Sequence, residues 1–425
     1  MKHLLALIWI ATSTFAVAQN NSPTLTDASP AERSIAEAEK MIREKPAQYA
    51  SYNLLAMALV RQARETSDAG YYAQAEGAVQ KSLQLAPNAF DTRKIQVEIL
   101  LGEHEFPAAL DAAKMLNQQV PDDVMVYGLL TDADAELGNY TDAEKSAQWM
   151  LNLQPGNLPA LTHAARLREL FGDIEGSYEL LEMAYQSTPS TENEERAWLL
   201  TQMGHVRLSA GNTDAAEKLL QQSLTAFPHY SLAVSNLAEV RMAQARYEEA
   251  AVLFRQRYQS TPRARHLYDL AQALRLAGHA AEANTAFAEF EAKSLLESNK
   301  KDNSNRELVF YYADYAKDPT KALQTARREY AWRRDVYTLD AYAWALHANG
   351  QDLEARKQIE TALSVGIRDA NLFHHAGEIA LKLGDAAAAE SYLKQSAELN
   401  TAGRSDVTLA GFSKARQLGL ERCGP

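Results

Sequence analysis

The stretch PDDVMVYGLLTDADAELGNYTDAEKSAQWMLNLQP, from Pro121 to Pro155, is one unit of a pattern that recurs along this chain of 425 residues. Prolines recur at one fixed interval, at Pro87, Pro121, Pro155 and Pro189. Gly138 and Gly172 each stand midway between two of these prolines and end an apolar run. A fixed period of this length is typical of stacked structural repeats, so the sequence predicts a repeat array.

The sequence pattern of each unit predicts two antiparallel helices joined by a short turn. A glycine near the end of the first helix can take the left-handed conformation that closes a helix. The proline ends the second helix because it cannot donate the next backbone hydrogen bond. The glycines expected to close first helices are Gly70, Gly138, Gly172, Gly211 and Gly278. The small residues expected where the second helix approaches the first are Ala75, Ala109, Ala143, Ala216 and Ala250.

These positions resemble the tetratricopeptide repeat, whose units have the same length as the interval between the prolines. The resemblance is carried by a large apolar residue beside a small one in the first helix, as in Leu237-Ala238, and by a glycine two residues before an aromatic residue, as in Gly138 and Tyr140. Alanine follows in the second helix, and proline ends the unit. The second unit departs from the pattern, because His104 stands where the turn glycine is expected.

The resemblance covers roughly residues 31–400 and is strongest over 47–290. It implies an all-α, right-handed solenoid of about nine to ten antiparallel helix pairs. Along the chain we expect a signal peptide (1–18), a flexible leader (19–30), an N-terminal capping helix (31–46), the repeat array (47–297), a polar linker (298–305), further repeats (306–400), and a capping helix with a tail (401–425).

Two intervals between prolines exceed the regular spacing. The first runs from Pro46 to Pro87, and its excess lies just before Gly70, at the end of a first helix. The second long interval, after Pro189, has its excess in residues 190–196. There a threonine and a glutamate, at 191 and 194, have the spacing of a capping box, which would open the next helix.

The N-terminal segment 1–18 predicts an exported protein. Lys2 is followed by the apolar run Leu4–Ile10 and by the small residues Ala16-Val17-Ala18, so we expect cleavage after Ala18. The apolar run is too short for a permanent membrane helix, and no later apolar run is long enough to span. We therefore expect a periplasmic or secreted protein with no membrane span after signal removal. An uncleaved anchor is the alternative.

Composition and motifs argue against several function classes. The formal net charge of −12 speaks against nucleic acid as the main partner, because phosphate binding needs a concentrated basic surface. The single cysteine, Cys423, cannot form an internal disulfide. His374 and Glu378 have a spacing that can bind a cation, but no further ligand is evident in the sequence. The sequence therefore predicts no catalytic residues, no metal and no cofactor.

The resemblance also indicates where a partner would bind. In tetratricopeptide superhelices the first helices of successive units line a concave groove, and recurring positions there contact peptides. The groove residues predicted to contact a partner are Asp132, Arg166, His205, Glu239, Tyr268, Tyr311, Asp340 and Trp344. The aromatic members form either a binding patch or the packing of degenerate repeats. The Lys–Asn clamp that captures a carboxyl terminus in some family members is not matched, because Glu98 follows Lys94 where Asn is expected.

The sequence thus predicts an exported, non-enzymatic scaffold that binds a protein or peptide segment in its concave groove. The predicted fold and the predicted export signal together suggest, by analogy, a role in cell-envelope assembly or secretion. One alternative is a self-associating structural spacer, joined through Cys423 or the terminal helix. A further alternative is an α-helical enzyme with an acid/base site between its helices. The sequence does not predict the oligomeric state.

Overall fold

A computed structural model describes residues 29–399, and all regular structure in this range is helical. The chain starts with α1 (Pro30–Glu44), whose capping box is formed by Ser29 and Glu32. The pairs that follow are α2 (Tyr49–Thr66) and α3 (Gly70–Leu85), α4 (Phe90–Gly102) and α5 (Phe106–Gln119), α6 (Val124–Glu136) and α7 (Tyr140–Leu153), α8 (Leu158–Leu170) and α9 (Ile174–Ser187), and α10 (Asn193–Ser209) and α11 (Thr213–Ala226).

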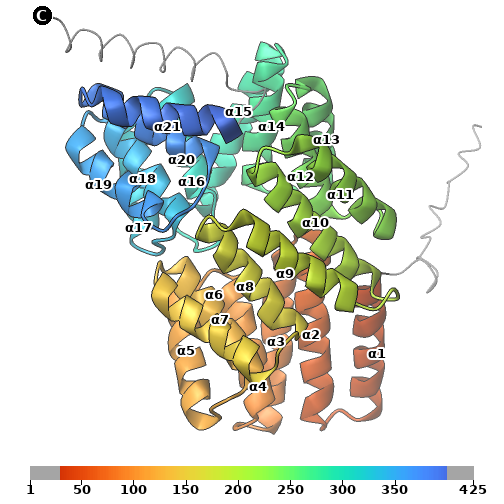
Figure 1. The fold of residues 1–425 in the computed structure, drawn as a ribbon. Coiled ribbons are helices and arrows are strands. Elements are labelled where there is room, and N and C mark those ends of the chain that lie inside the picture. Colours follow the sequence, from red (N-terminus) through yellow and green to blue (C-terminus); the bar gives the residue numbers. More distant parts are fainter. Residues whose placement is uncertain (1–28, 400–425) are drawn as a thin grey trace, which may run out of the picture.

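The second half continues in the same way. Its pairs are α12 (Ser231–Ala243) and α13 (Tyr247–Ser260), α14 (Ala264–Leu276) and α15 (Ala280–Glu297), α16 (Asn305–Phe310) with the π-helix η1 (Tyr311–Tyr315) and α17 (Pro319–Tyr330), α18 (Val336–Ala348) and α19 (Asp352–Leu363), and α20 (Ala370–Lys382) and α21 (Ala386–Leu399). Ten helix pairs therefore follow α1 in the described part of the chain. Figure 1 shows the early units, red to yellow, below the later units, green to blue. The predicted all-α solenoid is confirmed.

Alanines hold the two helices of each pair together. The predicted small residues Ala75, Ala109, Ala143, Ala216 and Ala250 are all 0% exposed. A larger side chain at these positions would push the helices apart, because protein interiors are packed too densely to absorb extra atoms. Their complete burial agrees with the prediction that the two helices of a pair approach closely at these residues.

The turns inside the pairs use the left-handed backbone conformation, but not always at glycine. Gly138 and Gly172 have φ values of 78° and 80°, as predicted, whereas His104 takes the same conformation at φ 62°. The expectation for Gly70 was wrong. It begins α3, and Ser67 closes α2 at φ 59°, because the extra residues of this unit extend the first helix and its turn.

Residues far apart in the sequence touch one another. Thr261 donates a hydrogen bond from Oγ1 to the Thr66 carbonyl at 2.8 Å, across 195 residues. Val336 donates its backbone N–H to the hydroxyl of Tyr140 at 2.9 Å, across 196 residues. Both separations equal about six repeat units, so one turn of the superhelix takes about six units and the next turn rests on it.

We call this line of contacts between successive superhelical turns the seam. It continues at Gly172, whose backbone lies so close to Gly366 that a Cβ atom on Gly172 would overlap the Gly366 carbonyl oxygen. A Cβ atom on Gly211 would lie 3.3 Å from the carbonyl oxygen of Leu399. At the seam, therefore, the glycines of the turns permit a close backbone approach as well as a left-handed conformation.

An ion pair next to the start of the seam joins the first unit to the fifth, which is less than one superhelical turn away. Glu194 on α10 is 0% exposed and accepts two hydrogen bonds from Arg64, at 3.1 and 2.8 Å, while Arg61 lies 3.6 Å away. The predicted capping box at Thr191 and Glu194 was therefore wrong. The helix begins at Asn193 without a side-chain cap, because the buried carboxylate needs the guanidinium groups of α2 as counterions.

The hydrophobic core continues past the polar loop 298–305. One cluster joins Leu167 of α8, Phe290 of α15 and Val336 of α18, so buried apolar contacts extend over both the loop and the seam. The predicted signal peptide, the leader up to residue 28 and the C-terminal capping helix over 401–425 lie outside the described residues. Within residues 29–399 no helix is both long and apolar enough to cross a membrane.

The seam contacts predict that two glycine-to-alanine substitutions lower the free energy of unfolding by different amounts. Gly172→Ala and Gly350→Ala both place alanine at a left-handed turn position, which costs about 1–2 kcal/mol. A Cβ atom at Gly350 would meet no described atom within 4 Å, whereas one at Gly172 would overlap Gly366. We expect Gly172→Ala to lower the free energy of unfolding by about 1–3 kcal/mol more than Gly350→Ala. Urea unfolding measures this difference, and equal midpoints would contradict the seam.

Candidate partner-binding site

A polar cavity of about 380 Å³ lies on the inner face of the middle units. This volume is in the range of ordinary ligand pockets. Its lining residues come from five helices or their ends: Gln202, His205, Leu232, Ser235, Asn236, Glu239, Arg257, Arg265, Asp269 and Glu307. Two of the predicted groove residues, His205 and Glu239, therefore meet in one cavity.

His205 carries a positive charge in this cavity. Its Nε2 atom lies 3.2 Å from Oε1 of Glu169 on the preceding unit. Burial opposes protonation, but the carboxylates of Glu169, Glu239 and Asp369 outweigh it and raise the pKa of His205 to about 9. The imidazolium can therefore donate a hydrogen bond to an anionic or carbonyl group at neutral pH.

The opposite wall holds an incompletely neutralised ion pair. Arg257 on α13 is 7% exposed, donates a hydrogen bond to Ser235 and lies 3.7 Å from Oδ2 of Asp269. Burial raises the pKa of Asp269 to about 7, and Glu239 and Glu307 add to the rise, although Arg257 opposes it. Asp269 is therefore only partly ionised at neutral pH, and the Arg257 charge is only partly balanced.

Several polar atoms of this wall are buried without a partner. The Nε atoms of Arg257 and Arg265 and the Oδ1 atom of Asn236 find no hydrogen-bond partner among residues 29–399. A buried donor or acceptor without a partner costs about 1–3 kcal/mol. The residues that carry these atoms line the cavity, so a ligand with both an acceptor and a donor satisfies the atoms once the side chains turn toward it.

Asp132 and Arg166 lie on the same inner face, outside the cavity lining. Asp132 contacts Nδ1 of His163 at 3.1 Å and Arg166 at 3.4 Å, and Arg166 also pairs with Glu136. Burial opposes ionisation of Asp132, but His163 and Arg166 outweigh it and lower its pKa. These two predicted residues are therefore charged and already paired.

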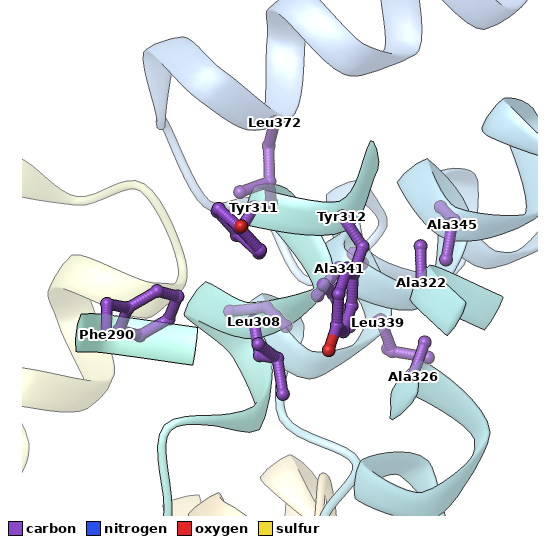
Figure 2. Packing of buried hydrophobic residues seen from close by; sticks show 14 of the residues in the cluster. Phe290, Leu308, Tyr311, Tyr312, Ala322, Ala326, Leu339, Ala341, Ala345 and Leu372 are labelled. Carbon is purple, nitrogen blue, oxygen red and sulfur yellow. The ribbon is translucent and has the colours of Figure 1, made fainter. Parts of the chain in front are cut away.

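The predicted C-terminal residues are less accessible than the sequence suggested. Tyr311 is 7% exposed and donates a hydrogen bond to Glu291 at 3.1 Å; Figure 2 shows it in the packed core near Leu308 and Leu372. The expectation that Tyr311 faces the groove was wrong. Its ring packs against those of Phe287 and Phe290, with centroid distances of 5.6 and 5.7 Å, which buries it in the core.

Asp340 and Trp344 form a packed group with histidines. Asp340 is 4% exposed and lies 2.7 Å from Nδ1 of His375. The Trp344 ring stacks on His375 with a centroid distance of 4.2 Å, and its Nε1 donates to Asp314 at 2.8 Å. Both predicted residues thus have partners within the chain.

Tyr268 is half-buried and accepts a hydrogen bond from Gln272 at 3.0 Å. Its ring lies against Phe290, with a centroid distance of 5.3 Å. It therefore belongs to the aromatic packing around α15. No group of three or more His, Cys, Asp or Glu side chains within residues 29–399 could hold a metal ion.

Several residues of the cavity wall were not predicted from the sequence, among them Arg257, Arg265 and Asp269. Arg257 lies on a second helix, whereas the groove positions considered were all on first helices. Arg265 lies three residues before the groove position Tyr268, and Asp269 lies one residue after it. The run Arg263–Asp269 contains three charged residues and a histidine at the start of a first helix, and this density was the available signal.

A larger hollow of about 550 Å³ lies at the seam, between the α8–α9 turn and the loop before α20. Its lining includes Phe171, Phe373 and Tyr392. It contains none of the predicted groove residues. The inner cavity is therefore the better candidate for partner binding.

The charge of His205 is testable by NMR. In protein labelled with ¹³C at the histidine rings, we expect the His205 resonance to titrate near pH 9. Glu169→Gln should lower this pKa toward the ordinary value of about 6.5, and Glu354→Gln on the outer helix α19 should leave it unchanged. The stability from this charge is complete below pH about 6.5 and is lost as the pH rises through about 9. Titration near 6.5 in the wild type would contradict the assignment.

Comparisons with known proteins agree with the geometry. A sequence model described as tetratricopeptide repeat matches residues 207–267, which include Glu239, Arg257 and Arg265. No curated protein matches the chain significantly. A human IFIT1 dimer solved with m7Gppp-AAAA has a TM-score of 0.50 and 14% identity, with 87% of this chain and 86% of that chain covered.

Two other solved structures share less of the geometry. PilW, described as a type IV pilus biogenesis factor, has 16% identity and a TM-score of 0.42, covering 48% of this chain and 93% of that one. Yeast Tom70 has 12% identity and a TM-score of 0.36, covering 86% and 96%. At these identities, likeness concerns the fold alone. The fixed period of the sequence, the ten helix pairs and the matched repeat model together identify the chain as a tetratricopeptide repeat protein.

Proposed function

We propose that this protein is an exported, non-enzymatic scaffold that binds an extended segment of a protein partner in its inner cavity. Tetratricopeptide repeats serve protein–protein interaction, and stacked repeats present long concave surfaces for it. The export part of the proposal comes from the N-terminal sequence, Lys2 with Leu4–Ile10 and Ala16–Ala18. Because the N-terminal sequence predicts export, the proposal includes a role in envelope assembly or secretion.

The observation that carries the proposal is that three residues of the cavity lining carry buried polar atoms without a partner among residues 29–399. Arg257 and Arg265 offer donors, and Asn236 offers an acceptor. A peptide backbone presents C=O and N–H groups at regular spacing, so one extended segment can satisfy both kinds of atom. Glu239 and the charged His205 stand beside them and can select side chains of either charge.

The other predicted groove residues take a secondary place in the proposal. Asp132 and Arg166 lie on the same inner face, and their exposed side-chain atoms can contact a longer segment. Tyr268, Asp340 and Trp344 are proposed to shape and stiffen the wall of the groove beyond the cavity, because their polar atoms are bonded within the chain. Tyr311 supports this wall from the core.

A binding experiment tests the proposed site. Linear peptides selected by display on the mature chain would be measured by fluorescence anisotropy. We expect Arg265→Ala to weaken binding at least tenfold, which is about 1.4 kcal/mol, because it removes a donor from the cavity. Arg356→Ala is the matched control, since Arg356 lies on the outer helix α19 and is 44% exposed. Equal affinity of wild type and Arg265→Ala would contradict the proposed site.

A further inference from the structure

We infer that the inner cavity is reached only along the axis of the superhelix, so that its partner must enter by a free chain end. The inference rests on the proposed function for the identity of the partner, but the route of entry is a property of this chain alone. It excludes segments in the middle of a folded domain, whose two ends are both held.

The seam closes the side of the inner channel from one unit to the next. Thr66 meets Thr261, Tyr140 meets Val336, and Glu136 accepts the backbone N–H of Arg334 at 3.3 Å. Each contact joins the turn of an early unit to the loop of a unit one superhelical turn later. A backbone atom is one partner in all three contacts, and the contact of Arg334 with Glu136 joins backbone to backbone.

The later part of the seam is closed by backbone packed on backbone. The Gly172 turn lies against Gly366, and Gly366 in turn lies against the Phe171 carbonyl, which a Cβ atom on Gly366 would approach to 2.6 Å. The Gly211 turn lies against Leu399 at the end of α21. The seam therefore extends from the first unit to the fifth, over the described length of the second superhelical turn.

Buried charges hold the seam beside the cavity. His104 accepts a hydrogen bond from Arg333 at 3.0 Å and lies 3.7 Å from Asp302, which also pairs with Arg263. Burial and the nearby Arg333 lower the pKa of His104 to about 4, and Arg265 of the cavity wall contributes to the same effect. Arg263 of this group is two residues before Arg265 of the cavity wall, so entry past this part of the seam would have to separate these groups.

The Arg64–Glu194 pair lies at the same end of α2 as Thr66 and joins the first unit to the fifth. Glu194 is fully buried, so separating it from Arg64 and Arg61 would leave an uncompensated carboxylate away from water. Moving the end of α2 away from the later units is therefore costly, and the seam contact of Thr66 with Thr261 lies at that same end. Entry along the axis separates none of these groups.

Cysteine labelling tests the route of entry without a known partner. In a Cys423→Ser background, Gln202→Cys places one thiol in the cavity lining. Two maleimides of equal mass serve as probes. One is on the end of a linear polyethylene glycol, and the other is joined by a short linker to the surface of a small folded protein. Glu144→Cys on the exposed face of α7 is the control site, which both probes should label at similar rates.

We expect the linear probe to label Gln202→Cys at least about tenfold faster than the folded probe, relative to the control site. This ratio corresponds to an opening free energy of at least about 1.4 kcal/mol. Glu194→Gln, which keeps the shape of the side chain but removes its charge, should speed labelling by the folded probe. Equal rates for both probes in the wild type would overturn the inference.

The proposed function and this inference fail separately. If no selected peptide depends on Arg265, the cavity is not the partner site, and the labelling ratio is unaffected. If the folded probe labels the cavity quickly while peptides still bind through Arg265, the seam is open in solution and the free-end requirement is wrong. If Glu194→Gln loses its helical circular dichroism, the comparison of the two probes without that substitution still tests the inference.

Discussion

The close approach of two helices at a buried alanine is the constraint on which the rest of this structure depends. Ala143, like its counterparts in neighbouring units, is 0% exposed, so the distance between the two helices of a pair is fixed by a methyl group. A constant pair geometry, repeated from unit to unit, gives a constant rotation per unit. After about six units that rotation brings the chain back over its own beginning, and the seam forms.

The seam changes the physics expected of a repeat array. In an open solenoid each unit contacts only its neighbours, and local damage stays local. Here Tyr140 and Val336 are bonded across 196 residues, and the Arg64–Glu194 pair joins the first and fifth units. The stabilities of distant units are therefore coupled, because these contacts join units that are not neighbours along the chain.

The sequence predicted what recurs with the period and missed what depends on the superhelix. Ala143 and Gly138 repeat at fixed offsets, so their roles were visible before the structure. Glu194 was taken for a helix cap, because its partner Arg64 is 130 residues away and no period connects them. Arg257 was missed because it reaches the inner face from a second helix. Tyr311 was misplaced because its ring packs against Phe287 and Phe290 of α15, and the period alone does not predict these contacts.

Contact between successive superhelical turns is the central claim, and hydrogen exchange on a Tyr140→Phe variant tests it most directly. The substitution removes only the hydroxyl that accepts the Val336 N–H. We expect faster exchange in residues 334–338, with the units between, such as α12 and α13, unchanged. Exchange that stays unchanged in residues 334–338 would contradict the account and favour an open, linear stack.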